Sequence, residues 1–297
     1  MENGIISEKK LLITVILNFI ITVAEVAGGL ISNSLALLSD ALHNLGDSVA
    51  VLIAYLAHRV SKKNPDKRKT FGYKRIEILA AFINSTFLAA ICIFLIYEAI
   101  QRIQHPQQID GLVMLIVACV GFLANIFAVF LLKSDSSKNI NVRAAYLHLL
   151  GDTLSSAMVI TGGILIYFLN ISWLDPIITI LISLYIIKES YTLIKDSVNI
   201  LMQTAPDKLD LEGIKKDIEL LPEVLNIHHI HAWNLNEQEI HFEGHIDLNK
   251  DLQVSQTDKI RKKIESLLTE KYNIVHFTLQ MEFGCCDDTE MIHQGTH

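Results

Sequence analysis

Six long apolar segments constrain this chain more than any other feature of its sequence. They lie at about 9–31, 35–60, 76–103, 110–133, 141–168 and 173–200. Each has close to or more than the ~20 residues that an α-helix needs to cross the hydrocarbon core of a bilayer. Charged residues make up 19% of the chain, below the ~25% that is usual in soluble domains. The sequence therefore predicts a membrane protein with six transmembrane helices in the lipid bilayer.

The loops between these segments differ in charge, which predicts their orientation. The N-terminal stretch and the loops after the second and fourth segments carry Lys and Arg, whereas the loops at 31–34, 104–109 and 169–172 carry neither. Because basic loops stay on the cytoplasmic side, we expect both termini in the cytoplasm. The first segment can span and further spans follow, so we expect an uncleaved anchor. The formal net charge of −7 argues against a nucleic-acid partner.

The C-terminal part of the chain has the pattern of a soluble domain. We expect Pro206 to break the last membrane helix. Periodicity then predicts helices at 207–221 and 254–271 and strands at 224–236, 239–248 and 274–283. This α-β-β-α-β order predicts an α+β fold of the ferredoxin-like kind. We therefore divide the chain into a transmembrane domain (1–203), a cytoplasmic ferredoxin-like domain (204–284) and a flexible C-terminal tail (285–297).

The pentapeptide His-x-Leu-Gly-Asp occurs twice, at 43–47 and 148–152, each time inside an apolar segment. A charge at membrane depth costs ~2.5–3.5 kcal/mol on insertion scales, so a repeated set of ionisable residues indicates function. His43 and Asp47 share one helix face, as do His148 and Asp152. The predicted orientation makes these helices antiparallel, with both pairs near the bilayer midplane. Two His and two Asp suit a tetrahedral Zn²⁺ site.

Other polar residues accompany the repeat. Asp40 lies three residues before His43 and is a candidate accessory ligand or proton group, with a role at a helix end or entrance as the alternative. For Glu25 and Asn84 we expect interhelical hydrogen bonds. Gly46 and Gly151 are expected to permit close helix approach.

A metal site at mid-membrane between antiparallel helices is suited to a transporter. Zn²⁺ binds neutral imidazole, so protons and metal compete for the same groups. This predicts a Zn²⁺/H⁺ antiporter that exports zinc by alternating access. The alternatives are a structural hydrogen bond within each His–Asp pair, a different ion such as Cd²⁺ or Co²⁺, and a membrane metal sensor that does not transport. We predict no enzymatic activity, because no His-Glu-x-x-His helix is present.

Four stretches of the sequence, at 39–47, 70–77, 148–152 and 228–233, resemble the cation diffusion facilitator family, in its zinc-transporting branch. The resemblance covers nearly the whole chain. It implies proton-coupled export and a homodimer formed through the cytoplasmic and membrane domains, with the two His-x-Leu-Gly-Asp copies as the transport site. The loop at 134–141 is short and has no His, which looks prokaryotic and implies the bacterial inner membrane.

The resemblance also points to metal in the soluble domain. It implies a zinc site of His228, His245 and Glu282 that senses cytoplasmic metal or stabilises the dimer, with solvated surface histidines as the alternative. In the strand at 239–248, odd-numbered residues from His241 to Asp247 share one face. The loop at 66–73 lacks the His that a further zinc site of some bacterial members requires.

The adjacent Cys285 and Cys286 are candidate ligands in the tail or across a dimer. Their alternative interpretation is a disordered polar end.

Overall fold

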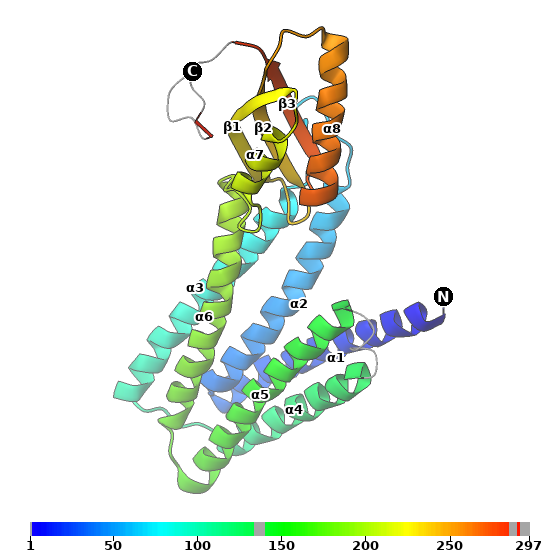
Figure 1. Ribbon diagram of the computed structural model, residues 1–297. Helices are drawn as coiled ribbons and strands as arrows, with labels where there is room; N and C mark the ends of the chain where they lie inside the picture. The colour runs from blue at the N-terminus through cyan, green and yellow to red at the C-terminus, as the bar shows by residue number, and fades with distance from the viewer. Residues whose placement is uncertain (1, 134–139, 285–289, 292–297) are drawn as a thin grey trace. The chain divides into compact units, whose positions relative to one another are not determined.

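The computed structural model describes residues 2–133, 140–284 and 290–291 (Figure 1). Six long helices come first: α1 (Glu2–Ser32), α2 (Leu35–Ser61), α3 (Ile76–Gln104), α4 (Gly111–Lys133), α5 (Ile140–Leu169) and α6 (Leu174–Leu201). Five of them, α2 to α6, are long and apolar enough to cross a membrane over the described residues, and α1 adds an apolar helix from Ile16 to Ser32. The predicted helical membrane fold is confirmed.

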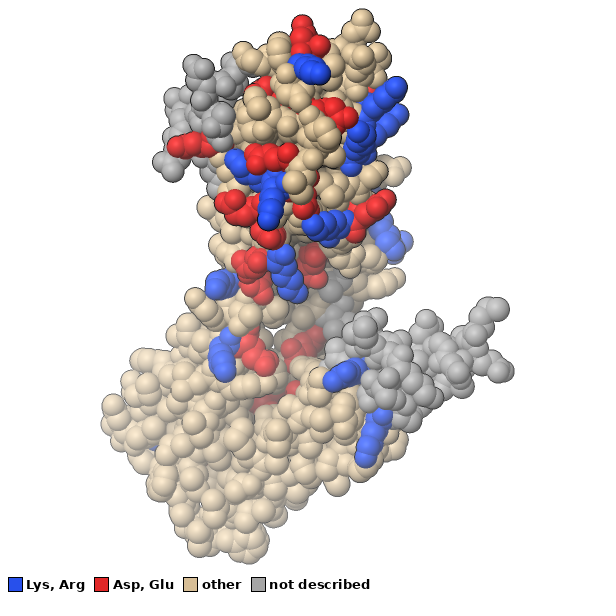
Figure 2. Space-filling view, viewed as in Figure 1, with Lys and Arg blue, Asp and Glu red and all other residues tan. Residues whose placement is uncertain are grey.

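The outward faces of these helices are apolar. Phe87, Phe94 and Phe130 each expose more than 60% of their surface, at 67%, 62% and 67%. Figure 2 shows that Lys, Arg, Asp and Glu gather on the soluble domain, whereas the visible outer face of the helical part is almost bare of them. Such a surface is suited to lipid, because no water is available there to hydrate charge.

Helix α2 begins at a cap that comes from another helix. Asp175, at the start of α6, accepts hydrogen bonds from the Ser34 hydroxyl (2.5 Å) and from the backbone N–H groups of Leu35 (2.9 Å) and Ala36 (3.1 Å). All of these residues are buried. The cap satisfies donors that a helix start otherwise leaves unpaired. Because it fixes where α2 starts, it also fixes the position of His43, about two turns further along the helix.

Close packing between helices depends on small residues at particular places. A Cβ atom on Gly121 of α4 would lie 2.3 Å from Glu25 Oε1 of α1. Glu25 in turn accepts a hydrogen bond of 2.9 Å from Asn44 Nδ2 on α2, so the interhelical hydrogen bond expected for Glu25 is confirmed.

The two glycines of the repeat differ in their surroundings. The expected close approach is confirmed at Gly46, where a Cβ would lie 3.1 Å from Leu88. It is wrong at Gly151, where the nearest atom is Tyr185 Oη at 3.8 Å, an ordinary contact distance.

The soluble domain has the predicted element order: α7 (Leu211–Glu219), β1 (Val224–Asn234), β2 (Ile240–Leu248), α8 (Val254–Tyr272) and β3 (His276–Glu282). Strands β1 and β2 are antiparallel, β2 and β3 are parallel, and β2 lies in the middle. The expected break at Pro206 is wrong in position. Helix α6 already ends at Leu201, and the chain leaves it through Gln203 in the left-handed region, at φ 57°.

One face of the sheet carries the hydrophobic core of this domain. Ile214 and Ile218 of α7, Phe242 and Ile246 of β2 and Ile264 of α8 are all fully buried in one cluster. Since side chains alternate along a strand, the odd-numbered residues of β2 lie on the opposite face, away from α7 and α8. That open face carries the histidines.

The loop between α2 and α3 belongs to the same compact unit as the soluble domain, together with the adjoining ends of α2, α3 and α6. The remainder of the six helices forms the other unit. Lys74 Nζ pairs with Glu239 Oε2 at 2.5 Å. Phe71 presents its ring edge-on to His241 and His276, with ring centroids 5.4 and 6.0 Å away. The loop therefore contacts the N-terminal ends of β2 and β3 through an ion pair and an aromatic cluster.

Candidate metal centres

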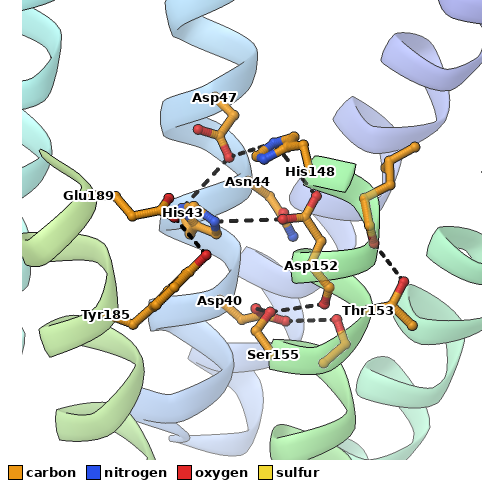
Figure 3. A network of polar contacts seen from close by, with 12 residues as sticks. Asp40, His43, Asn44, Asp47, His148, Asp152, Thr153, Ser155, Tyr185 and Glu189 are labelled. Carbon is orange, nitrogen blue, oxygen red and sulfur yellow. Dashed lines mark hydrogen bonds and ion pairs between the residues drawn. The ribbon is translucent and has the colours of Figure 1, made fainter. Parts of the chain in front are cut away.

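The two copies of the repeat meet in the structure (Figure 3). His43 Nδ1 lies 3.6 Å from Asp47 Oδ2 on the same helix, and His43 Nε2 lies 3.6 Å from Asp152 Oδ1 on α5. His148 Nε2 lies 3.2 Å from Asp47 Oδ2 and 3.7 Å from Asp152 Oδ2. One ligand atom each from His43, Asp47 and Asp152 lies within 4.8 Å of the others. Pairs that are far apart in the sequence thus converge.

The burial and pairing of these groups decide what the cluster can bind. Asp152 is 1% exposed and His43 is 6% exposed. His43 Nδ1, Asp47 Oδ2 and both Asp152 oxygens are buried and have no hydrogen-bond partner among the described residues. Buried carboxylate oxygens are normally paired, and a divalent cation would pair all of them at once. His148 exposes 44% of its side chain and stands on the open side of the cluster.

Asp40 lies beside the cluster, and both of its oxygens accept hydrogen bonds. Ser155 Oγ donates to it at 2.5 Å and Ser156 Oγ at 3.1 Å, both from α5. Asp40 therefore joins α2 to α5 one turn before His43. These serines were not predicted from the sequence, although two adjacent hydroxyls one turn after Asp152 in an apolar helix were an available signal.

A second group of ligands lies on the open face of the soluble sheet. Glu282 of β3 lies between two histidines, 2.8 Å from His245 Nδ1 and 3.5 Å from His228 Nε2. The side chains of His228 and Glu282 are 6% and 5% exposed. His228 Nδ1 is 2.8 Å from Asn226 Oδ1, an acceptor that keeps the ring proton on Nδ1 and leaves Nε2 for a cation. His228 Nε2 is buried and without a hydrogen-bond partner in the described part of the chain. The donor set fits Zn²⁺.

A bulge in β1 makes this arrangement possible. His228 pairs with His245 and His231 pairs with Glu243, with a register shift between the two pairs. Partners in a ladder share a face, so His228 and His231 lie on the same face although they are three positions apart in the sequence. His229 takes up the extra residue at φ 54°. A simple alternating strand would have placed His228 and His231 on opposite faces.

The other predicted residues lie elsewhere. His241 shares the odd-residue face of β2 but packs against Trp233 and His276, with ring centroids 5.5 and 4.4 Å away. Asp66 accepts hydrogen bonds from the backbone N–H groups of Arg68 and Lys69, which lower the pKa of its carboxyl. Cys285 and Cys286 lie outside the described residues.

Comparison with known families covers most of the chain. Residues 11–202 match the cation efflux transmembrane domain, and residues 206–283 match the cytoplasmic domain of cation efflux proteins. The chain belongs to the cation efflux family. Both copies of the repeat lie within the first match of this family, and the His228–His245–Glu282 group lies within the second. The cation efflux family is a transporter family, and the resemblance found in the sequence is confirmed.

Several members of the cation efflux family are similar to the chain over most of their length. The zinc transporter ZitB of Pectobacterium atrosepticum is 42% identical, over 100% of this chain and 92% of its own. The metal cation efflux system protein CzcD of Cupriavidus metallidurans is 36% identical, over 96% and 89%. The cadmium, cobalt and zinc/H⁺-K⁺ antiporter of Bacillus subtilis is 37% identical, over 93% and 89%.

Proposed function

We propose that the chain exports Zn²⁺ from the cytoplasm of a bacterium in exchange for protons, by alternating access in the inner membrane, with Cd²⁺ and Co²⁺ as further cargo. His43, Asp47, His148 and Asp152 bind the ion. Both termini lie in the cytoplasm, the chain works as a homodimer, and it catalyses no covalent reaction. The names of similar proteins support zinc as cargo, and one of them is named as a cadmium, cobalt and zinc/H⁺-K⁺ antiporter.

The observation that carries the proposal is the set of unpartnered ligand atoms between α2 and α5. Four buried atoms from His43, Asp47 and Asp152 lack a hydrogen-bond partner within the described ranges, and His148 lies beside them. A His₂Asp₂ set carries two negative charges, so a divalent cation neutralises it. Imidazole nitrogen favours Zn²⁺, Co²⁺ or Cd²⁺ over Mn²⁺, which prefers oxygen ligands.

Proton exchange follows from the chemistry of the same side chains. The ion binds only when both imidazoles are neutral and both carboxylates are ionised. Protons that reach the cluster from outside therefore compete with the ion and release it. Since α2 and α5 supply one pair of ligands each, a relative movement of these two helices separates the pairs and opens the site.

The soluble group is the proposed resident metal site. His228, His245 and Glu282 would hold one Zn²⁺, which when bound neutralises the buried carboxylate and joins three strands. The match to a cation efflux cytoplasmic domain supports a dimer through this region. We assign this site a sensing or stabilising role, separate from transport.

The test is zinc flux in proteoliposomes with an imposed pH gradient. We expect Zn²⁺ transport that responds to the gradient, with measurable proton counterflow. His148→Ala is expected to abolish both, whereas His105→Ala, which changes an exposed histidine after α3, is expected to retain them. Zinc flux that ignores the pH gradient would exclude proton coupling. Zinc binding without flux would make the chain a sensor.

The same vesicles can be used to compare the transport of different divalent ions. We expect transport of Zn²⁺, Cd²⁺ and Co²⁺ and little transport of Mn²⁺. Preferred transport of Mn²⁺ would contradict the assignment of the two imidazoles as ligands.

A further inference from the structure

A hollow of about 300 Å³ lies on the open face of the soluble sheet. Most of the residues that line it have no role in the proposed function. His229, His231, Glu243 and His245 border it. Three histidines and a carboxylate around one hollow are a potential ligand set for a transition-metal ion.

The bulge in β1 brings these side chains to one place. His231 and Glu243 are direct partners across the β1–β2 ladder, so their Cβ atoms are about 4.5–5.5 Å apart. Both side chains are exposed. His229, at φ 54°, contributes its ring to the same hollow. Its backbone N–H donates to Glu290 O at 3.3 Å and that of Ile230 donates to Met291 O at 2.8 Å, so the bulge is anchored outside the ladder.

The ring geometry of His229 and His231 suits a shared ion. Their centroids are 5.1 Å apart at an interplanar angle of 64°. Two imidazoles bound to one tetrahedral Zn²⁺ at ~2.0–2.1 Å have centroids about 5–6 Å apart. The pair His228 and His245, at 5.5 Å and 68°, meets the same criterion. Two histidine pairs with similar ring spacing therefore lie next to each other on this face. The ligand atoms of His228, His245 and Glu282 already lie within 4.8 Å of one another, whereas an outer ion would draw in the exposed side chains of His231 and Glu243 by rotation.

The two pairs belong to separate sites because of His245. The rings of His229 and His245 are stacked, with centroids 4.7 Å apart and planes at 18°. Ring-nitrogen lone pairs lie in the ring plane, so two stacked rings do not converge on one tetrahedral ion. His245 Nδ1 is also only 2.8 Å from Glu282 Oε1. This contact keeps His245 with His228 and Glu282, which form the inner group.

We propose that His229, His231 and Glu243 form a second divalent-cation site on the open face of the sheet, beside the His228–His245–Glu282 group. Two neutral imidazoles and one carboxylate favour Zn²⁺ over Ca²⁺ or Mg²⁺. Water completes the shell, because His231 and Glu243 face solvent. This outer site is open, so it binds zinc more weakly and exchanges it faster than the inner group.

The experiment counts zinc ions on the full-length protein. It uses a background with Asp47→Ala and Asp152→Ala, so that the transport site does not contribute. Equilibrium dialysis over a range of Zn²⁺ concentrations, with metal analysis, gives ions bound per chain. We expect the added pair His231→Ala and Glu243→Gln to remove the weaker of the bound ions or to lower its affinity by about tenfold or more.

Two controls separate the outer site from the inner one. His276→Ala changes another exposed histidine of the same domain and is expected to leave the count unchanged. His228→Ala is expected to remove the tighter ion and to retain the weaker one. An unchanged binding curve for the His231 and Glu243 pair would overturn the proposal, and so would the joint loss of both ions. These binding measurements do not depend on transport. A failure of the outer-site proposal can therefore be distinguished from a failure of the proposed export function.

Discussion

His43 on α2 and Asp152 on α5 lie with Nε2 and Oδ1 3.6 Å apart. This contact connects the two copies of the repeat, and Asp152 is the most deeply buried of the four proposed ligands. Asp152→Asn keeps the size of the side chain and removes its charge. We expect the initial rate of Zn²⁺ transport to fall by about 100-fold or more, because even changes behind a metal ligand cost 10- to 100-fold. Stopped-flow flux in vesicles measures this.

Asp196→Asn is the matched control, since Asp196 is exposed near the end of α6. Its transport rate should equal that of the unchanged protein. An Asp152→Asn protein that transports at the normal rate would rule out Asp152 as a ligand.

Asp175 caps α2 from α6, and its loss should destabilise the helical part. Asp175→Ala leaves the Ser34 hydroxyl and two backbone N–H groups without their acceptor. We expect a loss of about 2 kcal/mol, at the upper end for caps, because the site is buried. Asp110→Ala, which removes a local and exposed cap of α4, should cost about half as much. Thermal unfolding in detergent compares the two, and equal losses would contradict the role of burial.

The close contact between Gly121 and Glu25 predicts that a larger residue at position 121 destabilises the protein. Gly121→Ala places a methyl group where Glu25 Oε1 now lies, 2.3 Å from the new Cβ. Glu25 then moves away from Asn44, and we expect about 1–3 kcal/mol of destabilisation. At Gly151 the same change meets, among the described residues, just Tyr185 Oη at 3.8 Å. Gly151→Ala should therefore be neutral or up to about 1 kcal/mol stabilising, as measured by thermal unfolding.

Much of this architecture could be predicted from the sequence, because local patterns determine it. Apolar length gave the six helices, and helical spacing placed His43 with Asp47. The features that could not be predicted from the sequence depend on long-range contacts. Nothing near Asp175 indicates that it caps a helix 140 residues earlier in the chain. The bulge at His229 has no glycine to mark its left-handed backbone. Simple strand alternation would therefore place His228 and His231 on opposite faces.

Asp217 on α7 provides a test that depends on pH. It pairs with Lys271 and accepts a 2.6 Å hydrogen bond from Tyr272, and these partners lower the pKa of its carboxyl. A lowered pKa in the folded state stabilises the domain above the unfolded value of about 3.9, and this stabilisation is lost as the pH falls through the folded-state pKa. Asp217→Asn should therefore lower the urea midpoint at pH 7, and the difference should shrink below about pH 4.

The chain has 2 Trp, Trp173 and Trp233. In a Trp173→Phe background the remaining tryptophan fluorescence comes from Trp233 and therefore reports on this domain alone. Glu212→Gln, an exposed change on the same helix, is the control and should have little effect. A constant difference between Asp217→Asn and the unchanged protein down to pH 3 would contradict the assignment.

Zinc should stabilise the soluble domain through the inner group. At a free Zn²⁺ concentration 100 times the dissociation constant, the expected gain is about 2.7 kcal/mol. A chelator should reverse the gain. In a background with His231→Ala and Glu243→Gln, where the outer site does not contribute, Glu282→Gln should abolish it. Glu237→Gln, in the exposed loop between β1 and β2, should retain it. The same Trp233 signal measures each case, and zinc stabilisation that persists in Glu282→Gln would place the ion elsewhere.

The inner group takes one proposed ligand from each of the three strands of the sheet. Proteases degrade a folded chain through its transiently opened states, and an ion that joins all three strands makes such opening rarer. The half-life of the chain in the cell would then lengthen with cytoplasmic zinc, which a pulse–chase measurement with and without added zinc reads directly. The cell would keep this protein longest when its cargo is most abundant, without changing its rate of synthesis.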